Sequence, residues 1–179
     1  MTALRFNYQQ DKAQKNISTF GKHVLNLGCN TDPAHLKELF PNHVLNVDFM
    51  YYDYVLDKTI NADMYFDITK DWPLCNNNYG LVILGDIMEH IRWEEWPHVL
   101  AEARRVASNL CITVPNDSRI ILDDRNLPLG SYHVIQVTEE KLKEQIEKSG
   151  WEITEFVKLG KENEESWWIE YYFLLAERN

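Results

Sequence analysis

The chain has 179 residues, a length that fits one domain and leaves little sequence for a second. Hydrophobic residues make up 45% and charged residues 26%, the balance of an ordinary globular protein, which excludes a disordered or fibrous chain. The formal net charge of −10 repels phosphate backbones and anionic lipid, and the sequence shows no local basic patch that would offset it. We therefore expect a small-molecule partner, and we expect neither nucleic acid nor a membrane.

The cysteines and histidines give no sign of a disulfide framework or a metal site. Cys29, Cys75 and Cys111 are odd in number and have no CxxC spacing, which fits a reducing compartment. The six histidines show no metal-ligand spacing. The first residues have no apolar run typical of a signal peptide, and no window is apolar and long enough for a membrane helix. These features predict a cytoplasmic protein without a metal, and they leave its oligomeric state open.

Strands and amphipathic helices are predicted to alternate along the chain. Apolar and β-branched runs predict strands at residues 23–27, 43–48, 62–68, 79–86 and 109–115. Between the first two, a helix is expected to begin at Asp32, a good N-cap followed by proline, and to end before Pro41. A longer helix is expected at 93–106, where apolar residues recur at helical spacing.

The end of the chain changes from this alternation to a hairpin. Thr138, which is followed by glutamates, should open a helix that ends near Gly150. Two β-rich runs, 151–157 and 166–176, are joined by a polar segment and predict two antiparallel strands. The whole pattern predicts an α/β fold, with a Rossmann-like doubly wound, mostly parallel seven-stranded sheet and an antiparallel C-terminal hairpin. We expect a single domain over residues 1–179.

Polar clusters follow four of the predicted strands, and ligands of such folds bind at the carboxyl ends of the strands. A carboxylate that closes the second strand, as Asp48 does, can accept hydrogen bonds from both hydroxyls of a ribose. Gly28 after the first strand lets the backbone approach a ligand closely. Each feature alone is weak, because Gly28 is also a common turn residue and Asp48 a common strand-end cap. Their order and spacing together predict a nucleoside site.

The loop that begins at Gly28 argues against a dinucleotide. It reads Gly-Cys-Asn-Thr-Asp-Pro, so Asn30 stands where a G-x-G-x-x-G loop has its second glycine. Asp32 would place a carboxylate at the helix end where phosphates bind, and like charges there are costly. An NAD-dependent oxidoreductase is therefore disfavoured, whereas S-adenosylmethionine carries no phosphate and tolerates this loop.

The runs HVLNLGCNTDP, HVLNVDF, ADMYFDITKDWPL and YGLVILGDIMEHI resemble, in this order, the motifs of class I S-adenosylmethionine-dependent methyltransferases. The resemblance covers residues 22–176, leaves 1–22 as an N-terminal extension, and implies S-adenosylmethionine as the cofactor. The positions that it assigns to the cofactor site are Asn26, Gly28, Cys29, Asn30, Asp48, Phe49, Asp67, Ile68, Leu84 and Gly85.

The resemblance implies a role for most of these positions. Asp48 would hold the ribose hydroxyls, Asp67 would meet the adenine amino group, and Gly28 with its neighbours would contact the methionine part. Further contacts, an apolar wall beside the adenine and a floor beneath the sulfonium, would come from Ile68, Leu84 and Gly85. Two positions depart from the family pattern, because Asn26 replaces an acidic residue and Asn30 replaces a glycine.

No catalytic residue is fixed by the pattern, because the sulfonium already activates the methyl group and the enzyme mainly aligns the reactants. The candidates are His90, His133 and Asp86, and each histidine could equally be a capping or turn residue. We expect an open acceptor pocket between Gly85, His90 and residues 123–133. The predicted function is methyl transfer to a small-molecule acceptor, and the alternative is an inactive methyltransferase-like binding or scaffold protein.

Overall fold

The computed structural model describes residues 2–29, 34–49, 52–53, 58–116, 134–159 and 170–178. Its helices are α1 (Thr2–Phe20), α2 (Ala34–Leu39), α3 (Trp96–Val106) and α4 (Glu139–Lys148), with a short 3-10 helix, η1 (Met88–His90). Its strands are β1 (His23–Leu27), β2 (Val44–Asp48), β3 (Tyr52–Asp53), β4 (Lys58–Thr59), β5 (Met64–Tyr65), β6 (Tyr79–Gly85), β7 (Ala107–Asn116), β8 (Trp151–Leu159) and β9 (Glu170–Arg178).

Seven of these strands form one sheet in the order β5-β2-β1-β6-β7-β9-β8, and β3 pairs with β4 separately. The five strands from β5 to β7 run parallel, whereas β9 is antiparallel to both β7 and β8. The strand order therefore reverses between β1 and β6, which is where ligands bind in doubly wound sheets. The predicted α/β fold, with its mostly parallel sheet and antiparallel C-terminal pair, is confirmed.

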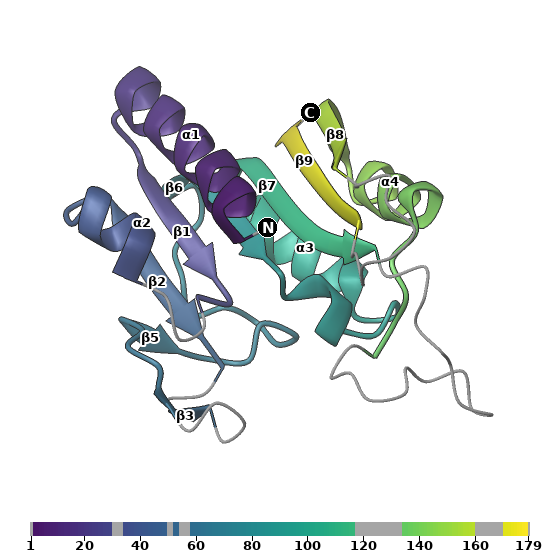
Figure 1. The fold of residues 1–179 in the computed structure, drawn as a ribbon, viewed down its shortest axis with the longest axis horizontal. Coiled ribbons are helices and arrows are strands. Elements are labelled where there is room, and N and C mark those ends of the chain that lie inside the picture. The colour runs from purple at the N-terminus through teal and green to yellow at the C-terminus, as the bar shows by residue number, and fades with distance from the viewer. Residues whose placement is uncertain are drawn as a thin grey trace.

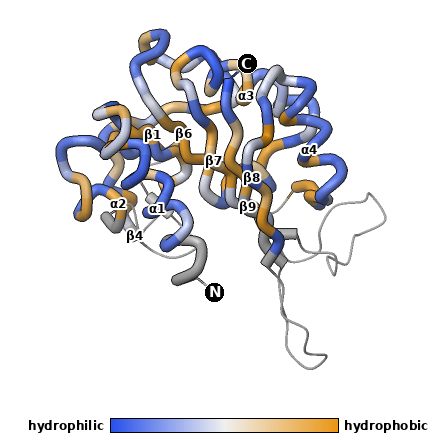
Figure 2. The backbone as a smooth tube through the Cα atoms, turned by 90° about the horizontal axis from the view of Figure 1, so that it is seen from above, coloured by the Kyte–Doolittle hydropathy of each residue, from blue (hydrophilic) through white to orange (hydrophobic). Residues whose placement is uncertain are grey.

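Helices cover both faces of the sheet (Figure 2). Alternate residues of a strand face opposite layers, so Leu25 and Leu84 pack in the core beneath α3 and α4, whereas Val24 and Ile83 pack beneath α1 and α2. All four side chains are fully buried. Burial on both sides explains why β1 and β6 read as nearly continuous apolar runs.

α3 confirms the periodicity predicted from its sequence. It begins at Trp96, three residues later than the expected 93, with a proline in its first turn. The residues of its apolar stripe are each 0% exposed, and they are Trp96, Val99, Leu100, Ala103 and Val106. The helix is thus held to the sheet by apolar burial along its whole length.

α4 begins and ends where its capping residues predict. The Thr138 hydroxyl oxygen accepts a hydrogen bond from the Lys141 amide (3.3 Å), and Gly150 adopts a φ of +80° just beyond the last turn. Its apolar residues Leu142 and Ile146 are fully buried against the sheet core.

The third strand is shorter than the sequence indicates. Residues 62–68 were expected to be extended, but only Met64–Tyr65 pair with β2. The chain turns at Asp67, whose carboxylate accepts hydrogen bonds from the amide (2.9 Å) and the hydroxyl (2.7 Å) of Thr69. This side-chain turn competes with the ladder and ends the strand early.

α1 is the main element that the sequence analysis did not predict. The segment expected as an N-terminal extension is a helix packed on the sheet, with Ala13 fully buried. Among the described side chains of α1, the other buried ones are polar, namely Gln9, Lys12 and Asn16, and Tyr8 and Ile17 are partly buried against the same core. The polar residues interrupt the apolar periodicity that predicts most amphipathic helices. In the described residues, no helix is both long and apolar enough to cross a membrane.

Candidate functional site

The carboxyl ends of β5, β2, β1 and β6 meet at one edge of the sheet (Figure 1). These strands are neighbours in that order, so the residues that follow them are brought side by side although they are far apart in the sequence. Every predicted cofactor residue in the described part of the chain lies in or directly after one of these strands. Asn30 lies outside the described residues.

Asp48 and Phe49 form the centre of this edge. One carboxylate oxygen of Asp48 accepts a hydrogen bond from the Phe49 amide (2.8 Å), and the thiol of Cys29 donates to the other oxygen (3.7 Å). The Phe49 side chain is 61% exposed, which is unusual for a ring of its size. A half-buried carboxylate therefore stands beside an exposed aromatic ring.

Cys29 acts here as a neutral hydrogen-bond donor. Burial of the thiol, together with the nearby Asp48 charge, raises the pKa of Cys29 far above its usual value. Because only a thiolate is a good nucleophile, Cys29 is not suited to covalent catalysis. Its position ties the end of β1 to the end of β2.

Gly28 is required by the backbone rather than by open space for a ligand. Its φ is +68°, and a Cβ added there would lie 2.8 Å from Cδ1 and 2.9 Å from Cβ of Ile87. The amides of Gly28 and Cys29 both point to the carbonyl of Val47, at 3.0 and 3.4 Å. These first two amides of the loop are thus engaged with β2 and are not directed at a ligand.

Asn26 replaces the family's acidic residue with an amide that is used inside the sheet. Its side-chain nitrogen donates to Oδ1 of Asn46 on the adjacent strand (3.0 Å), and the two residues are 8% and 1% exposed. The backbone N–H of Asn46 donates to the Asp63 carboxylate (2.9 Å). Asn26 therefore helps to fix the register of β1 and β2, since the pair lies directly opposite in the ladder.

Asp67 lies two residues after β5, next to the end of β2, because the Phe66 amide donates to the Asp48 carbonyl (3.0 Å). Burial opposes its charged form, but the two hydrogen bonds from Thr69 outweigh this and hold the pKa of Asp67 below its usual value. Asp67 is therefore a carboxylate at neutral pH. Both Thr69 bonds go to the same oxygen, Oδ1.

Ile68 and Leu84 are placed in the core rather than at the edge. Ile68 is 5% exposed and its carbonyl accepts a hydrogen bond from the Trp72 indole (2.8 Å). Leu84 is fully buried in the layer beneath α3 and α4. Neither side chain is exposed at the sheet edge where the cofactor is expected. Both lie in the apolar layer behind that edge.

The end of β6 carries a chain of hydrogen bonds that sequence reasoning missed. The Gln9 amide of α1 donates to the Thr113 hydroxyl (2.8 Å), which donates to the Asp86 carboxylate (3.2 Å). A Cβ added to Gly85 would lie 2.6 Å from the Gln9 amide nitrogen, so Gly85 makes room for this side chain. Asp86 has a φ of +51°, a conformation that is rare outside glycine and that collects at functional sites.

His90 lies on η1, directly after Asp86 and its loop. Its imidazole is 40% exposed, and its Nε2 is 3.8 Å from Oε1 of Glu89, which is 2% exposed. The Glu89 carbonyl accepts the amide of Val134 (2.9 Å), so the chain returns to this point after residues 117–133. His133 and the loop 123–133 lie outside the described residues, and with them the predicted acceptor pocket.

The geometry can be compared with known proteins. No protein-family model matches the chain. No curated protein matches it either.

Among described residues, no three His, Cys, Asp or Glu side chains are grouped so that they could hold a metal ion.

Solved structures share the fold at low sequence identity. A SAM-dependent methyltransferase from Methanosarcina mazei has a TM-score of 0.63 at 11% identity, covering 87% of this chain and 92% of its own. One from Archaeoglobus fulgidus has a TM-score of 0.60 at 18% identity, covering 97% and 94%. The small RNA methyltransferase HEN1 has a TM-score of 0.71 at 14% identity, covering 100% of this chain but only 25% of its own. The chain therefore has the fold of S-adenosylmethionine-dependent methyltransferases.

Proposed function

We propose that the protein is an S-adenosylmethionine-dependent methyltransferase. The observation that carries the proposal is the edge where β5, β2, β1 and β6 end, which brings Asp48 and Asp67 together in the fold that these enzymes have. Sequence order alone suggested a nucleoside site, and the strand order supports it because Asp48 ends β2 and Asp67 lies two residues after the adjacent β5.

The residues at this edge fit the cofactor. Asp48 offers carboxylate oxygens for ribose hydroxyls, and the exposed Phe49 ring beside it offers an apolar face for a planar base. Asp67, kept charged by Thr69, can accept a hydrogen bond from an amino group. The net charge of −10 favours a ligand with a cationic sulfonium.

The same loop does not suit a dinucleotide. Dinucleotide-binding folds place the pyrophosphate at the N-terminus of the helix after the first strand, where this sequence has Asp32, whose like charge would oppose it. The amides of Gly28 and Cys29 both donate to the Val47 carbonyl. This supports the cofactor proposed here over NAD.

The cofactor, when bound, supplies an already activated methyl group, so the chain has to position two partners and exclude water. In this proposal Asp48 and Asp67 hold the nucleoside, and Gly85 makes room for the Gln9 side chain at the end of β6. The Gln9–Thr113–Asp86 chain and His90 lie on the acceptor side, where they orient the group that receives the methyl. We propose a small molecule as the acceptor, because the acidic chain repels a polyanion.

A transfer assay tests the activity and the acceptor class together. Protein is incubated with S-adenosylmethionine that carries a labelled methyl group, and with either a small-molecule extract or an RNA extract. We expect label in the small-molecule fraction. Label in RNA alone would contradict the acceptor class, and the match to HEN1 makes that arm worth including. Label in neither fraction, with S-adenosylhomocysteine still bound, would favour the inactive scaffold.

A further inference from the structure

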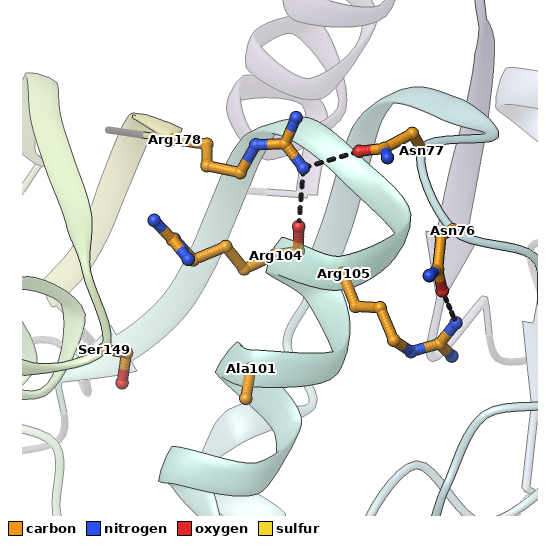
Figure 3. A pocket seen from close by; sticks show the side chains of 7 residues that line it. All are labelled: Asn76, Asn77, Ala101, Arg104, Arg105, Ser149 and Arg178. Atoms are coloured by element: carbon orange, nitrogen blue, oxygen red, sulfur yellow. Dashed lines mark hydrogen bonds between the residues drawn. The ribbon is translucent and has the colours of Figure 1, made fainter.

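A second concave site lies at the opposite edge of the sheet, where β6 begins and β9 ends. It is a cavity of about 370 Å³ bordered by the turn before β6, the last turns of α3 and α4, and the end of β9. Figure 3 shows three arginines around it, Arg104, Arg105 and Arg178. The candidate cofactor residues follow the carboxyl ends of the parallel strands, so this cavity is separate from them.

The charge of this cavity is opposite to that of the molecule. Three guanidinium groups line it, and none of the described residues that line it is Asp or Glu. The chain as a whole has a net charge of −10. The cluster could not be predicted from the sequence, because Arg178 is far along the chain from Arg104 and Arg105. The pairing of β9 with β7 brings Arg178 to the end of α3.

Arg105 has a structural role in the wall of the cavity. Its guanidinium donates to both carboxylate oxygens of Glu102 (2.8 and 2.7 Å). It also donates to the carbonyls of Leu74 (2.7 Å) and Trp72 (3.0 Å) and to Oδ1 of Asn76 (2.7 Å). These bonds engage all three of its nitrogens, so Arg105 holds the wall of the cavity and contributes little to a ligand.

Arg178 and Arg104 are held differently. One terminal nitrogen of Arg178 donates to Oδ1 of Asn77 (2.6 Å) and to the Arg104 carbonyl (3.2 Å). The Arg104 Nε donates to the Gly150 carbonyl (3.2 Å). The bond to the Arg104 carbonyl caps the end of α3, and the bond to the Gly150 carbonyl joins α3 to the turn after α4. A guanidinium carries five N–H donors, and the bonds to Asn77 and to the Arg104 carbonyl both use the same terminal nitrogen of Arg178.

The other polar groups in the wall are donors too. Because Oδ1 of Asn77 accepts from Arg178, the amide nitrogen is the part of that side chain that can face a ligand. Ser149 adds a hydroxyl from the end of α4. A cavity with two oriented guanidinium groups, an amide, a hydroxyl and no carboxylate is suited to an oxyanion with several acceptor oxygens.

We propose that this cavity binds the phosphoryl group of a small phosphorylated ligand. Phosphate matches the planar, multidentate donors of arginine better than a monodentate anion does. A nucleic acid has the same phosphate chemistry, but its backbone carries many negative charges, which the net charge of −10 of the chain repels. The proposal does not depend on the proposed methyltransferase activity, because the two sites share no residue.

The test titrates inorganic phosphate against the full chain by calorimetry, at constant ionic strength set with chloride. We expect saturable binding to the wild type, and a loss of about 10-fold or more in affinity for Arg178→Gln. Ala101→Glu is the second variant, because Ala101 is an exposed helix residue that lines the cavity and its replacement removes no native contact. It should weaken binding by placing a carboxylate in the wall.

Arg92→Gln is the matched control, because Arg92 is exposed and does not line the cavity. It should bind phosphate as the wild type does. Absence of phosphate binding by the wild type, or equal binding by wild type, Arg178→Gln and Ala101→Glu, would overturn the proposal. A short single-stranded oligonucleotide that binds more tightly than phosphate, and that also needs Arg178, would overturn the assignment to a small ligand. Melting temperatures in chloride verify that each variant is folded.

Discussion

Asp48 closes β2 with one carboxylate oxygen held by the next amide and the other turned toward the Cys29 thiol. Both donors are neutral groups of neighbouring residues, and a carboxylate can accept about four hydrogen bonds in all. Its neighbour Phe49 is 61% exposed. We therefore expect Asp48 to contribute more to binding than to folding.

Asp48→Ala should therefore lower the affinity for S-adenosylhomocysteine with little change in the free energy of unfolding. Loss of two charge-assisted hydrogen bonds corresponds to about 2–4 kcal/mol, or about 30-fold or more in Kd. Asp71→Ala is the control, because the Asp71 side chain is 99% exposed and lies away from β2. Calorimetric titration of both variants measures the difference, and an unchanged Kd for Asp48→Ala would remove this residue from the site.

Glu102 provides a prediction about pH. The hydrogen bond from Arg105, opposed by burial and aided by the Trp72 amide, holds the pKa of Glu102 below its ordinary value of 4.5. A lowered pKa in the folded state stabilises the protein above the unfolded value, and this stability is lost as the pH falls through the folded value. Urea unfolding at neutral pH and below 4.5 should show a larger acid loss of unfolding free energy in the wild type than in Glu102→Gln. Glu94→Gln, at an exposed position, should behave as the wild type, and equal acid sensitivity of all three proteins would count against the assignment.

At the scale of elements, α1 differs from α3 and α4 in what attaches it to the sheet. α3 is held by a fully buried apolar stripe. Among the described side chains of α1, Ala13 is fully buried and Tyr8 and Ile17 are partly buried, whereas Gln9, Lys12 and Asn16 bring polar groups to the sheet. Lys12 is 9% exposed and donates to the Glu155 carboxylate on β8 at 2.7 Å. α1 therefore also depends on specific polar partners, and Gln9 reaches Thr113 on β7, beside Gly85 at the end of β6.

Lys12→Ala should destabilise the protein by about 1–3 kcal/mol, because it leaves a partly buried carboxylate without its cation. Lys15→Ala, an exposed lysine on the same helix, should change the free energy of unfolding by less than about 0.5 kcal/mol. Urea denaturation of both variants measures the difference. Equal effects of the two substitutions would show that the contact between Lys12 and Glu155 does not hold the helix.

Most elements could be predicted from local signals, and the exceptions have physical reasons. Strands β1, β2, β6 and β7 are apolar runs, and α3 has its stripe, so hydrophobic periodicity was sufficient for them. α1 was missed because Gln9, Lys12 and Asn16 interrupt the apolar pattern of its buried side. β5 was predicted too long because the turn formed by Asp67 and Thr69 ends the pairing, and side-chain competition of this kind is not visible in periodicity.

For the whole molecule, the strand order decides what becomes a site. The clusters after the first four strands could be predicted from the sequence, because parallel strands bring their carboxyl ends to one edge. Gln9, Thr113 and the arginine cluster could not be predicted, because their neighbours come from distant segments that only the folded sheet joins. Folding thus creates two features that no local stretch of sequence contains, a hydrogen-bonded chain beside Asp86 and a cationic cavity at the opposite edge.

The central claim is that the edge formed by β5, β2, β1 and β6 binds S-adenosylmethionine. Calorimetric titration of the wild-type chain with S-adenosylhomocysteine, and in parallel with NAD, tests it most directly. We predict saturable binding of S-adenosylhomocysteine at one site per chain and no binding of NAD, because the loop after β1 has Asn30 in place of the second glycine of a dinucleotide loop and Asp32 where a phosphate would bind. Binding of NAD in its place, or no heat with S-adenosylhomocysteine from folded protein, would contradict the account.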